Sequence, residues 1–141
     1  MIAVDTNVLV YAHREELPQH RAAHARVVAL AGGTALWGIP VFCVTEFVRV
    51  VTHPRLFDPP YLAEEACRAM ERLLEAPTVR VLHPGPTFVT RFGEAVREAG
   101  AVGNLVFDAQ IVAVCREAGV TTLLTEDRDF ARFRRFKTEG L

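Results

Sequence analysis

The sequence predicts an α/β protein whose central, mostly parallel sheet is covered by helices on both faces. Short apolar segments of β character alternate with longer segments of helical periodicity along the chain. Parallel neighbouring strands need a crossover helix between them, so this alternation favours a parallel sheet. The length of 141 residues and the 50% hydrophobic content suit one packed core. We therefore expect a single domain over residues 1–141.

The expected elements follow one another without a linker long enough to separate domains. Four short apolar segments bounded by turn residues are the expected strands, at 2–5, 35–39, 78–82 and 120–125. The helices between them begin near prolines or an asparagine and mostly end near glycines, at 18–30, 40–53, 60–75, 86–99 and 104–118. Trp37, beside the second strand, is expected in the core. A sheet of this kind binds its ligand at the carboxyl ends of its strands.

Composition excludes several classes of protein. No apolar run approaches the roughly 18 residues of a membrane helix, so we expect a soluble, cytoplasmic protein without a cleaved signal. Cys43, Cys67 and Cys115 are odd in number and far apart, which supports neither a disulfide framework nor a zinc site. We expect all three to be buried thiols.

The formal net charge of -1 conceals a basic segment near the end of the chain. Residues 128–137 include four arginines and one lysine against the single acid Asp129. This segment could contact a polyanion, or it could be an ordinary solvated surface, and the sequence leaves both interpretations open.

Acidic side chains stand at the carboxyl ends of the first and last expected strands. Asp5 closes the first strand, and Asp127 follows the last. Asp5, Thr6 or Asn7 could simply cap the helix that follows, and Asp127 or Asp129 could cap a short final helix. Both strand ends nevertheless face the same crevice of the predicted sheet.

Glu46 and Asp108 are carboxylates at positions where the helical pattern indicates core. An unpaired ionised carboxylate in an apolar interior costs several kcal/mol, so each needs a partner. Glu46 could pair with Arg49 at i+3, whereas Asp108 has no basic residue within one turn, Arg116 being the nearest in sequence. If these acids converge with Asp5 and Asp127, a multivalent cation must offset their repulsion. All-oxygen ligation selects Mg²⁺ or Mn²⁺, and we prefer this metal site to isolated structural acids.

These motifs together resemble the PIN domain, and more narrowly a VapC-type toxin of a bacterial toxin–antitoxin pair. The resemblance spans the whole chain, in the expected order. It rests on the opening stretch 2–10, on Thr45-Glu46-Phe47, on Asp108 in a late helix and on the segment 125–130. The segment Thr52-His53-Pro54-Arg55 also recurs in one branch of such toxins.

The resemblance implies a three-layer α/β/α sandwich and cleavage of RNA with Mg²⁺ or Mn²⁺. It also implies a VapB-like antitoxin that blocks the site, and a homodimer. The implied catalytic and metal-binding residues are Asp5, Glu46, Asp108 and Asp127, with Asp129 as a further metal ligand. Thr6, Asn7 and Thr125 would orient the acids. Residues that could contact RNA or antitoxin are Arg49, His53, Arg55, Arg134 and Arg135.

The expected chemistry is attack on phosphorus by a water that the cation activates. No serine occurs in the sequence, and Cys43 and Cys115 lie in apolar helices, so no other nucleophile is indicated. His20 and His24 have an i, i+4 spacing able to bind metal but lack a third ligand, and we interpret them as surface residues.

Two other functions are weighed against the nuclease. A haloacid-dehalogenase-like phosphatase needs a second Asp two residues after the first, and here that residue is Asn7. A PIN-fold RNA- or partner-binding module without catalytic activity remains the alternative.

Overall fold

A five-stranded parallel sheet forms the centre of the computed structural model, which describes residues 1–134 and 136–141. The strands are β1 (Ile2–Val4), β2 (Trp37–Pro40), β3 (Val79–Leu82), β4 (Thr122–Leu124) and β5 (Lys137–Glu139). Their order is β3-β2-β1-β4-β5, and each of these neighbouring pairs is parallel. The chain thus extends the sheet from β1 in one direction and then returns past β1 to extend it in the other.

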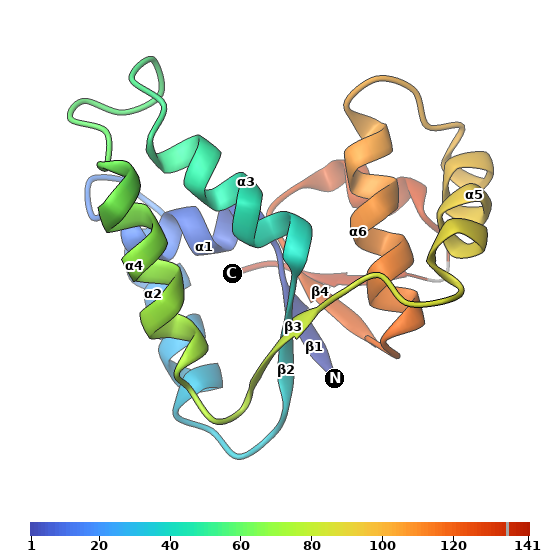
Figure 1. Ribbon diagram of the computed structural model, residues 1–141, viewed down its shortest axis with the longest axis horizontal. Helices are drawn as coiled ribbons and strands as arrows, with labels where there is room; N and C mark the ends of the chain where they lie inside the picture. Colours follow the sequence, from blue (N-terminus) through green and yellow to red (C-terminus); the bar gives the residue numbers. More distant parts are fainter. Residues whose placement is uncertain (135) are drawn as a thin grey trace.

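Helices cover both faces of this sheet (Figure 1). On one side lie α1 (Thr6–His13), α2 (His20–Ala31), α3 (Val41–Val51) and α4 (Ala63–Leu74). On the other side α5 (Phe88–Ala99) packs along α6 (Leu105–Glu117), and a 3-10 helix, η1 (Arg128–Arg132), follows β4. The predicted three-layer α/β/α architecture is confirmed. None of the helices in the described part of the chain has the length and apolarity needed to cross a membrane.

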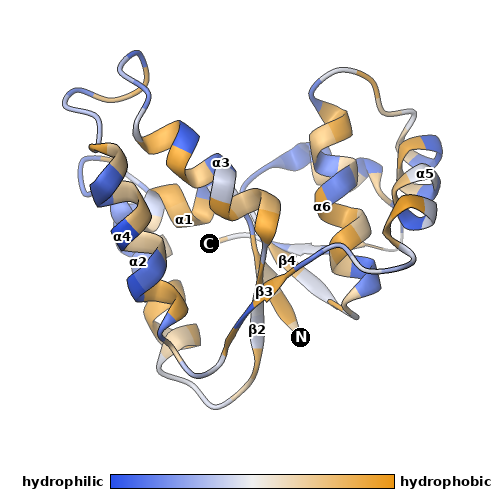
Figure 2. Ribbon diagram, in the orientation of Figure 1, coloured by the Kyte–Doolittle hydropathy of each residue, from blue (hydrophilic) through white to orange (hydrophobic). Residues whose placement is uncertain are grey.

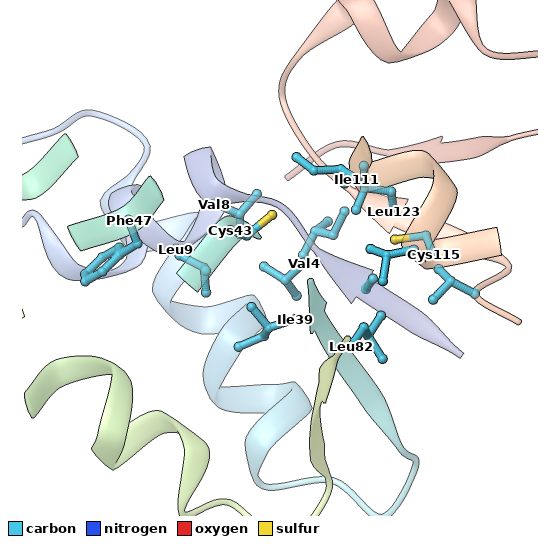
Figure 3. Close-up of a cluster of buried hydrophobic side chains, with 14 of the residues drawn as sticks. Val4, Val8, Leu9, Ile39, Cys43, Phe47, Leu82, Ile111, Cys115 and Leu123 are labelled. Carbon is cyan, nitrogen blue, oxygen red and sulfur yellow. The ribbon is translucent and has the colours of Figure 1, made fainter. Parts of the chain in front are cut away.

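The core lies on both sides of β1 and β2, where side chains of the two helical layers meet the sheet (Figure 3). Val4, Leu9, Ile39 and Leu123 have no exposed surface. Figure 2 shows that α6 is hydrophobic over most of its length, whereas α4 and α5 each carry a hydrophilic face. Trp37 is buried, as predicted.

Two features differ from the expectations. Cys67 is exposed on α4, so it is not a buried thiol, although Cys43 and Cys115 are. The strand β5 was not predicted, because its three residues are all exposed and carry no apolar alternation. It is an edge strand held by parallel pairing with β4 alone. Elsewhere the element boundaries agree with the predicted ranges to within about three residues.

The carboxyl ends of β1 and β4 lie side by side at the point where the strand order reverses. The Asp5 amide donates to the Leu124 carbonyl over 3.0 Å, and the Thr125 amide donates to the Glu139 carbonyl over 2.9 Å. Residues that leave β1 and β4 therefore enter one crevice at this switch point, where open α/β sheets bind ligands.

Candidate metal centre

Asp5 is the buried member of the acidic site. It leaves β1 in extended conformation, caps α1 and is only 4% exposed. Its Oδ1 accepts from the Thr6 amide (2.7 Å) and from the Cys43 thiol (3.7 Å). Its Oδ2 accepts from Asn7 Nδ2 (2.8 Å) and Thr125 Oγ1 (2.7 Å). Helix capping and membership of the acidic site, which the sequence offered as alternatives, are thus both realised in one carboxylate.

Burial raises the pKa of Asp5 to about 6, which is above the ordinary 3.8 of such a carboxyl. The hydrogen bonds from Thr125 and Thr6 favour the ionised form, but they do not offset the loss of hydration. The charges of Glu46 and Asp127 raise the pKa further. Asp5 is therefore an acid that would ionise more readily with a cation beside it.

Three small polar side chains connect Asp5 to the other acids. Thr6 Oγ1 donates to Glu46 Oε2 over 2.9 Å and so links α1 to α3. Asn7 Nδ2 also donates to Thr125 Oγ1 (3.1 Å), and the same Thr125 oxygen accepts from the Asp127 amide (3.0 Å). These contacts fix Glu46 on α3 and the segment that carries Asp127 relative to Asp5 before any ligand binds.

Glu46 stands on α3 with its side chain 38% exposed. Its Oε1 accepts from Arg49 Nη2 over 3.0 Å, so the i+3 ion pair that the sequence offered as an alternative does form. Arg49 is itself mostly exposed, and such surface pairs contribute only about 0.2–0.5 kcal/mol. This weak pair leaves Glu46 available to a stronger cation.

Asp108 lies in the first turn of α6, and its pKa is raised to about 7. Burial is the largest cause, and the charges of Asp127, Asp5, Asp129 and Glu46 follow in that order. No basic side chain is among these causes. Asp108 is therefore surrounded by other acids, and at a pH equal to this pKa half of its carboxyl groups are protonated.

Asp127 and Asp129 complete the site from η1. Asp127 caps this short helix, its Oδ1 accepting from the Asp129 amide over 2.8 Å. One carboxylate oxygen from each of Asp108, Asp127 and Asp129 lies within 4.8 Å of the other two. Both η1 acids thus approach Asp108, and both are exposed.

The acids stand where two hollows of the surface meet. A cavity of about 430 Å³ extends from Asp5, Glu46, Asp108 and Asp127 towards α1 and the α3–α4 loop, residues 52–62. A wider groove of about 770 Å³ runs from the same Glu46, Asp108 and Asp127 between α3 and α6. Asp129 and Arg49 line the groove only. A long ligand could therefore cross the acids while one of its parts enters the cavity.

The donor set suits a hard divalent cation. Among the described residues, the group near Asp108 that could hold a metal consists of carboxylates alone, which favours Mg²⁺ or Mn²⁺ over zinc. Cys43, although close to Asp5, is fully buried, and burial raises the pKa of its thiol well above the ordinary value. It remains a neutral hydrogen-bond donor, which the sequence did not reveal.

The remaining candidate residues lie at different distances from the acids. His53 and Arg55 occupy the α3–α4 loop, where the Arg55 amide donates to His53 Nδ1 over 3.1 Å. The Arg134 carbonyl accepts from Arg116 at the far end of α6 (2.8 Å), two turns from Asp108. Arg135 lies outside the described residues.

The histidine pair on α2 is only partly at the surface. His24 is exposed, but His20 is half-buried, and its Nδ1 is 2.9 Å from the Tyr11 carbonyl. Neither residue lines the two hollows at the acids.

Comparison with known proteins identifies the family of this chain. The PIN domain model matches residues 2–136. Ribonuclease VapC43 of Mycobacterium tuberculosis is 38% identical over 97% of this chain and 92% of that protein. Ribonuclease VapC48 of the same species is 33% identical over 92% of this chain and 89% of that protein.

Solved structures share the fold at lower identity. VapBC2 from Rickettsia felis, bound to a DNA fragment from its promoter, has a TM-score of 0.70 at 19% identity, over 99% of this chain and 98% of that chain. VapC20 of Mycobacterium tuberculosis, described as a sarcin–ricin loop cleaving toxin, has a TM-score of 0.69 at 19% identity, over 96% and 98%. The acids stand at the strand ends, the PIN domain model matches nearly the whole chain, and the similar proteins are VapC ribonucleases. The chain therefore belongs to the PIN domain family, in its VapC branch.

Proposed function

We propose that this protein is a metal-dependent endoribonuclease. Asp5, Glu46, Asp108 and Asp127 would hold Mg²⁺ or Mn²⁺, with Asp129 as a further ligand. One observation carries the proposal: carboxylates from the end of β1, from α3 and from η1 gather around Asp108 on α6, whose pKa is raised to about 7 by burial and by their charges. The ribonuclease names of the relatives supply the substrate class.

The chain's own residues would orient the substrate and hold the acids in position. When bound, a divalent cation supplies positive charge to the scissile phosphate and lowers the pKa of a water for attack on phosphorus. Asp5, held by four donors, is the fixed acid, and Asp127 and Asp129 approach from the exposed side. Arg49, which lines the groove, would contact the RNA backbone. Attack by water with departure of O3′ breaks the P–O3′ bond and leaves a 5′-phosphate and a 3′-hydroxyl. The ribose 2′-OH would take no part, so no 2′,3′-cyclic phosphate would form.

The proposed biological role is that of the toxin of a toxin–antitoxin pair. Its partner would be a VapB-like antitoxin, as in the VapBC assembly of Rickettsia felis. A homodimer is also proposed. It is supported by the largely exposed apolar side chains of Val89, Val102 and Phe107 on α5, on the segment after it and on α6. Light scattering of the purified chain measures this oligomeric state.

The test of the enzymatic function is cleavage of total RNA by the purified protein. We expect new RNA ends with Mg²⁺ or Mn²⁺ and none with EDTA, and mapping should find 5′-phosphates. Asp108→Asn should abolish cleavage. Glu71→Gln, an exposed acid on α4 away from the two hollows, is the control and should leave cleavage unchanged.

Two outcomes would contradict the proposal in different ways. A 2′,3′-cyclic phosphate product would exclude attack by water while leaving a ribonuclease. RNA binding without cleavage under every metal condition would instead favour the alternative, a PIN-fold RNA- or partner-binding module without catalytic activity.

A further inference from the structure

The cavity beside the acids has an apolar end that metal binding does not use. The acids line its 430 Å³ from before α1 and from the middle of α3, and the apolar side chains follow one turn or more further along the same helices. Side chains from α1, α3, α6 and the two loops that follow α1 and α3 form the apolar end, namely Tyr11, Leu17, Val50, Leu56, Phe57 and Ile111. Among the described residues that line it there is no lysine or arginine. This end therefore suits an uncharged group, because a phosphate would find no cationic side chain among these residues.

The α3–α4 loop, which forms one wall of this cavity, is held in place by Arg14 and by the end of α1. Arg14, which is buried, places its guanidinium 4.3 Å from the centre of the Phe57 ring and 4.8 Å from that of Tyr61. The same guanidinium donates to the Pro59 carbonyl (2.8 Å), and Tyr61 Oη donates to the His13 carbonyl (2.6 Å). The α3–α4 loop is thus fixed against α1 without a ligand. Because this loop is already ordered, a ligand that binds against it causes a smaller loss of conformational entropy.

The position of the cavity restricts what enters it. A polyanion whose phosphate lies at the acids would place an adjoining uncharged group at the cavity mouth, since the acids form one of its walls. The volume lies within the range of roughly 300–1,000 Å³ that is typical of small-ligand sites. Unstacked nucleobases bind proteins by stacking on aromatic and apolar side chains, and Tyr11, Leu56 and Phe57 offer such surfaces.

We propose that the apolar end binds one unpaired nucleobase of the RNA, from a nucleotide next to the scissile phosphate, and thereby selects the site of cleavage. The proposal rests on the proposed ribonuclease function. Leu56, 56% exposed at the rim, is the specificity residue that can be changed with least risk to the fold. Phe57 is less suitable, because its ring also holds Arg14.

The first experiment measures nucleobase binding without metal or catalysis. Methyl NMR spectra of the protein in EDTA are recorded with adenosine, guanosine, cytidine, uridine and, as a control, ribose. We expect at least one nucleoside, and not ribose, to shift the methyl resonances of Leu17, Leu56 and Ile111. Leu56→Ser should weaken that binding on the order of 10-fold. Leu36→Ser, with a similar exposure of 52% outside the cavity, should leave it unchanged.

The second experiment uses an RNA that the wild-type protein cleaves, with an abasic nucleotide at each position around the cut. Removal of one particular base should lower kcat/KM about 10-fold or more for the wild type and Leu36→Ser, and clearly less for Leu56→Ser. Cleavage that is indifferent to every abasic position overturns the nucleobase site and leaves the ribonuclease standing.

The nucleoside spectra separate the two failures. Nucleoside shifts in a protein that cleaves no RNA would support the nucleobase site while the proposed catalysis fails. Absence of shifts with all four nucleosides overturns the inference and leaves the apolar end to a side chain of a protein partner.

Discussion

Asp108 is the residue at which fold stability and proposed function oppose each other most directly. Its pKa of about 7 means that, near neutral pH, ionising it works against both burial and the charges of four other acids. Its position in the first turn of α6 gives the negative charge some help from the helix dipole, but not enough to restore an ordinary pKa. A divalent cation would reverse this balance.

The first prediction concerns Asp108→Asn. In EDTA the variant should melt at the same temperature as the wild type or higher, by the equivalent of roughly 1–3 kcal/mol, because one of the repelling charges is gone. Mg²⁺ should raise the wild-type melting temperature by binding the folded state, and raise that of the variant far less. Thermal unfolding followed by circular dichroism measures both effects, with Glu71→Gln as the control.

The opposite outcome has a definite meaning. If Asp108 were a structural acid paired with a buried cation, the same substitution would strand that cation and destabilise the fold by several kcal/mol with or without metal. A variant that melts well below wild type in EDTA and still cleaves RNA would exclude the proposed metal site.

The second prediction is a pH dependence with the sign opposite to that of most carboxylates. In the folded state the pKa of Asp108 is about 7 and that of Asp5 about 6, against 3.8 for either unfolded. Between these values the folded chain binds more protons, so its stability in EDTA falls as pH rises from about 4 to 7. Burial lowers the pKa of His13, which contributes the opposite trend near pH 6.5.

The measurement is therefore the difference in unfolding free energy between the wild type and Asp108→Asn. Both are unfolded with urea from pH 4 to 8, and the contribution of His13 cancels in the difference. The wild type should lose stability relative to the variant as pH rises, and Mg²⁺ should diminish that loss. A difference that is constant over this range would contradict the raised pKa of Asp108.

At the scale of elements, β2 leaves no room for a side chain at Gly38, because Leu82 of β3 packs against it. A Cβ added to Gly38 would lie 2.8 Å from Leu82 Cδ1, and Leu82 is buried. We predict that Gly38→Ala destabilises the fold by about 1–3 kcal/mol through overpacking. Urea denaturation measures the loss. The double variant Gly38→Ala/Leu82→Ala should lose less unfolding free energy than the sum of the losses in the two single variants. Strictly additive losses would show that the contact with Leu82 is not the cause.

Elements with a strong apolar pattern were predictable, and those without one were not. The strands β1 to β4 could be recognised because apolar residues sit between turn signals, and the acids because charges interrupt such patterns or close them. Nothing of this kind marks β5, whose strand conformation comes from pairing with β4.

The apolar end of the cavity was missed for a related reason. Leu56 and Phe57 stand in a loop, where an apolar side chain on a functional wall looks the same in sequence as one in the core. Their position depends on the contacts of Arg14 with Phe57, Tyr61 and the Pro59 carbonyl, which join residues more than forty positions apart. Likewise, the approach of both Asp127 and Asp129 to Asp108 depends on the cap geometry of η1, which the spacing of the motif left open.

At the scale of the whole molecule, basic groups lie at both ends of α6. Arg49 lines the groove at its amino end, whereas Arg134 contacts Arg116 near its carboxyl end, about 12 Å along the axis from Asp108. The binding role predicted for the basic segment 128–137 can therefore be tested separately from that of Arg49.

The last prediction makes that separation by salt dependence. In an Asp108→Asn background, Arg49→Gln should weaken RNA binding and reduce its slope against log salt by about 0.7, the value for one single-strand phosphate contact. Replacing Arg134 and Arg135 by Gln should weaken binding of RNA or antitoxin and flatten its salt dependence. Fluorescence anisotropy at several salt concentrations measures each slope. If the salt slope of both RNA binding and antitoxin binding is unchanged in the Arg134 and Arg135 variant, the basic segment is ordinary solvated surface.

The pairing of β1 with β4 joins two segments that lie far apart in the sequence. The Thr121 amide donates to the Met1 carbonyl over 2.9 Å, and Ala3 lies in register with Leu123. Contacts of such long sequence separation form late, because the loop they close must first be ordered. During synthesis Asp5 leaves the ribosome 120 residues before Thr125, so it meets Thr125 and the η1 acids only after all the intervening segments have emerged. The acids therefore stay dispersed until that point, and the cluster assembles late in folding.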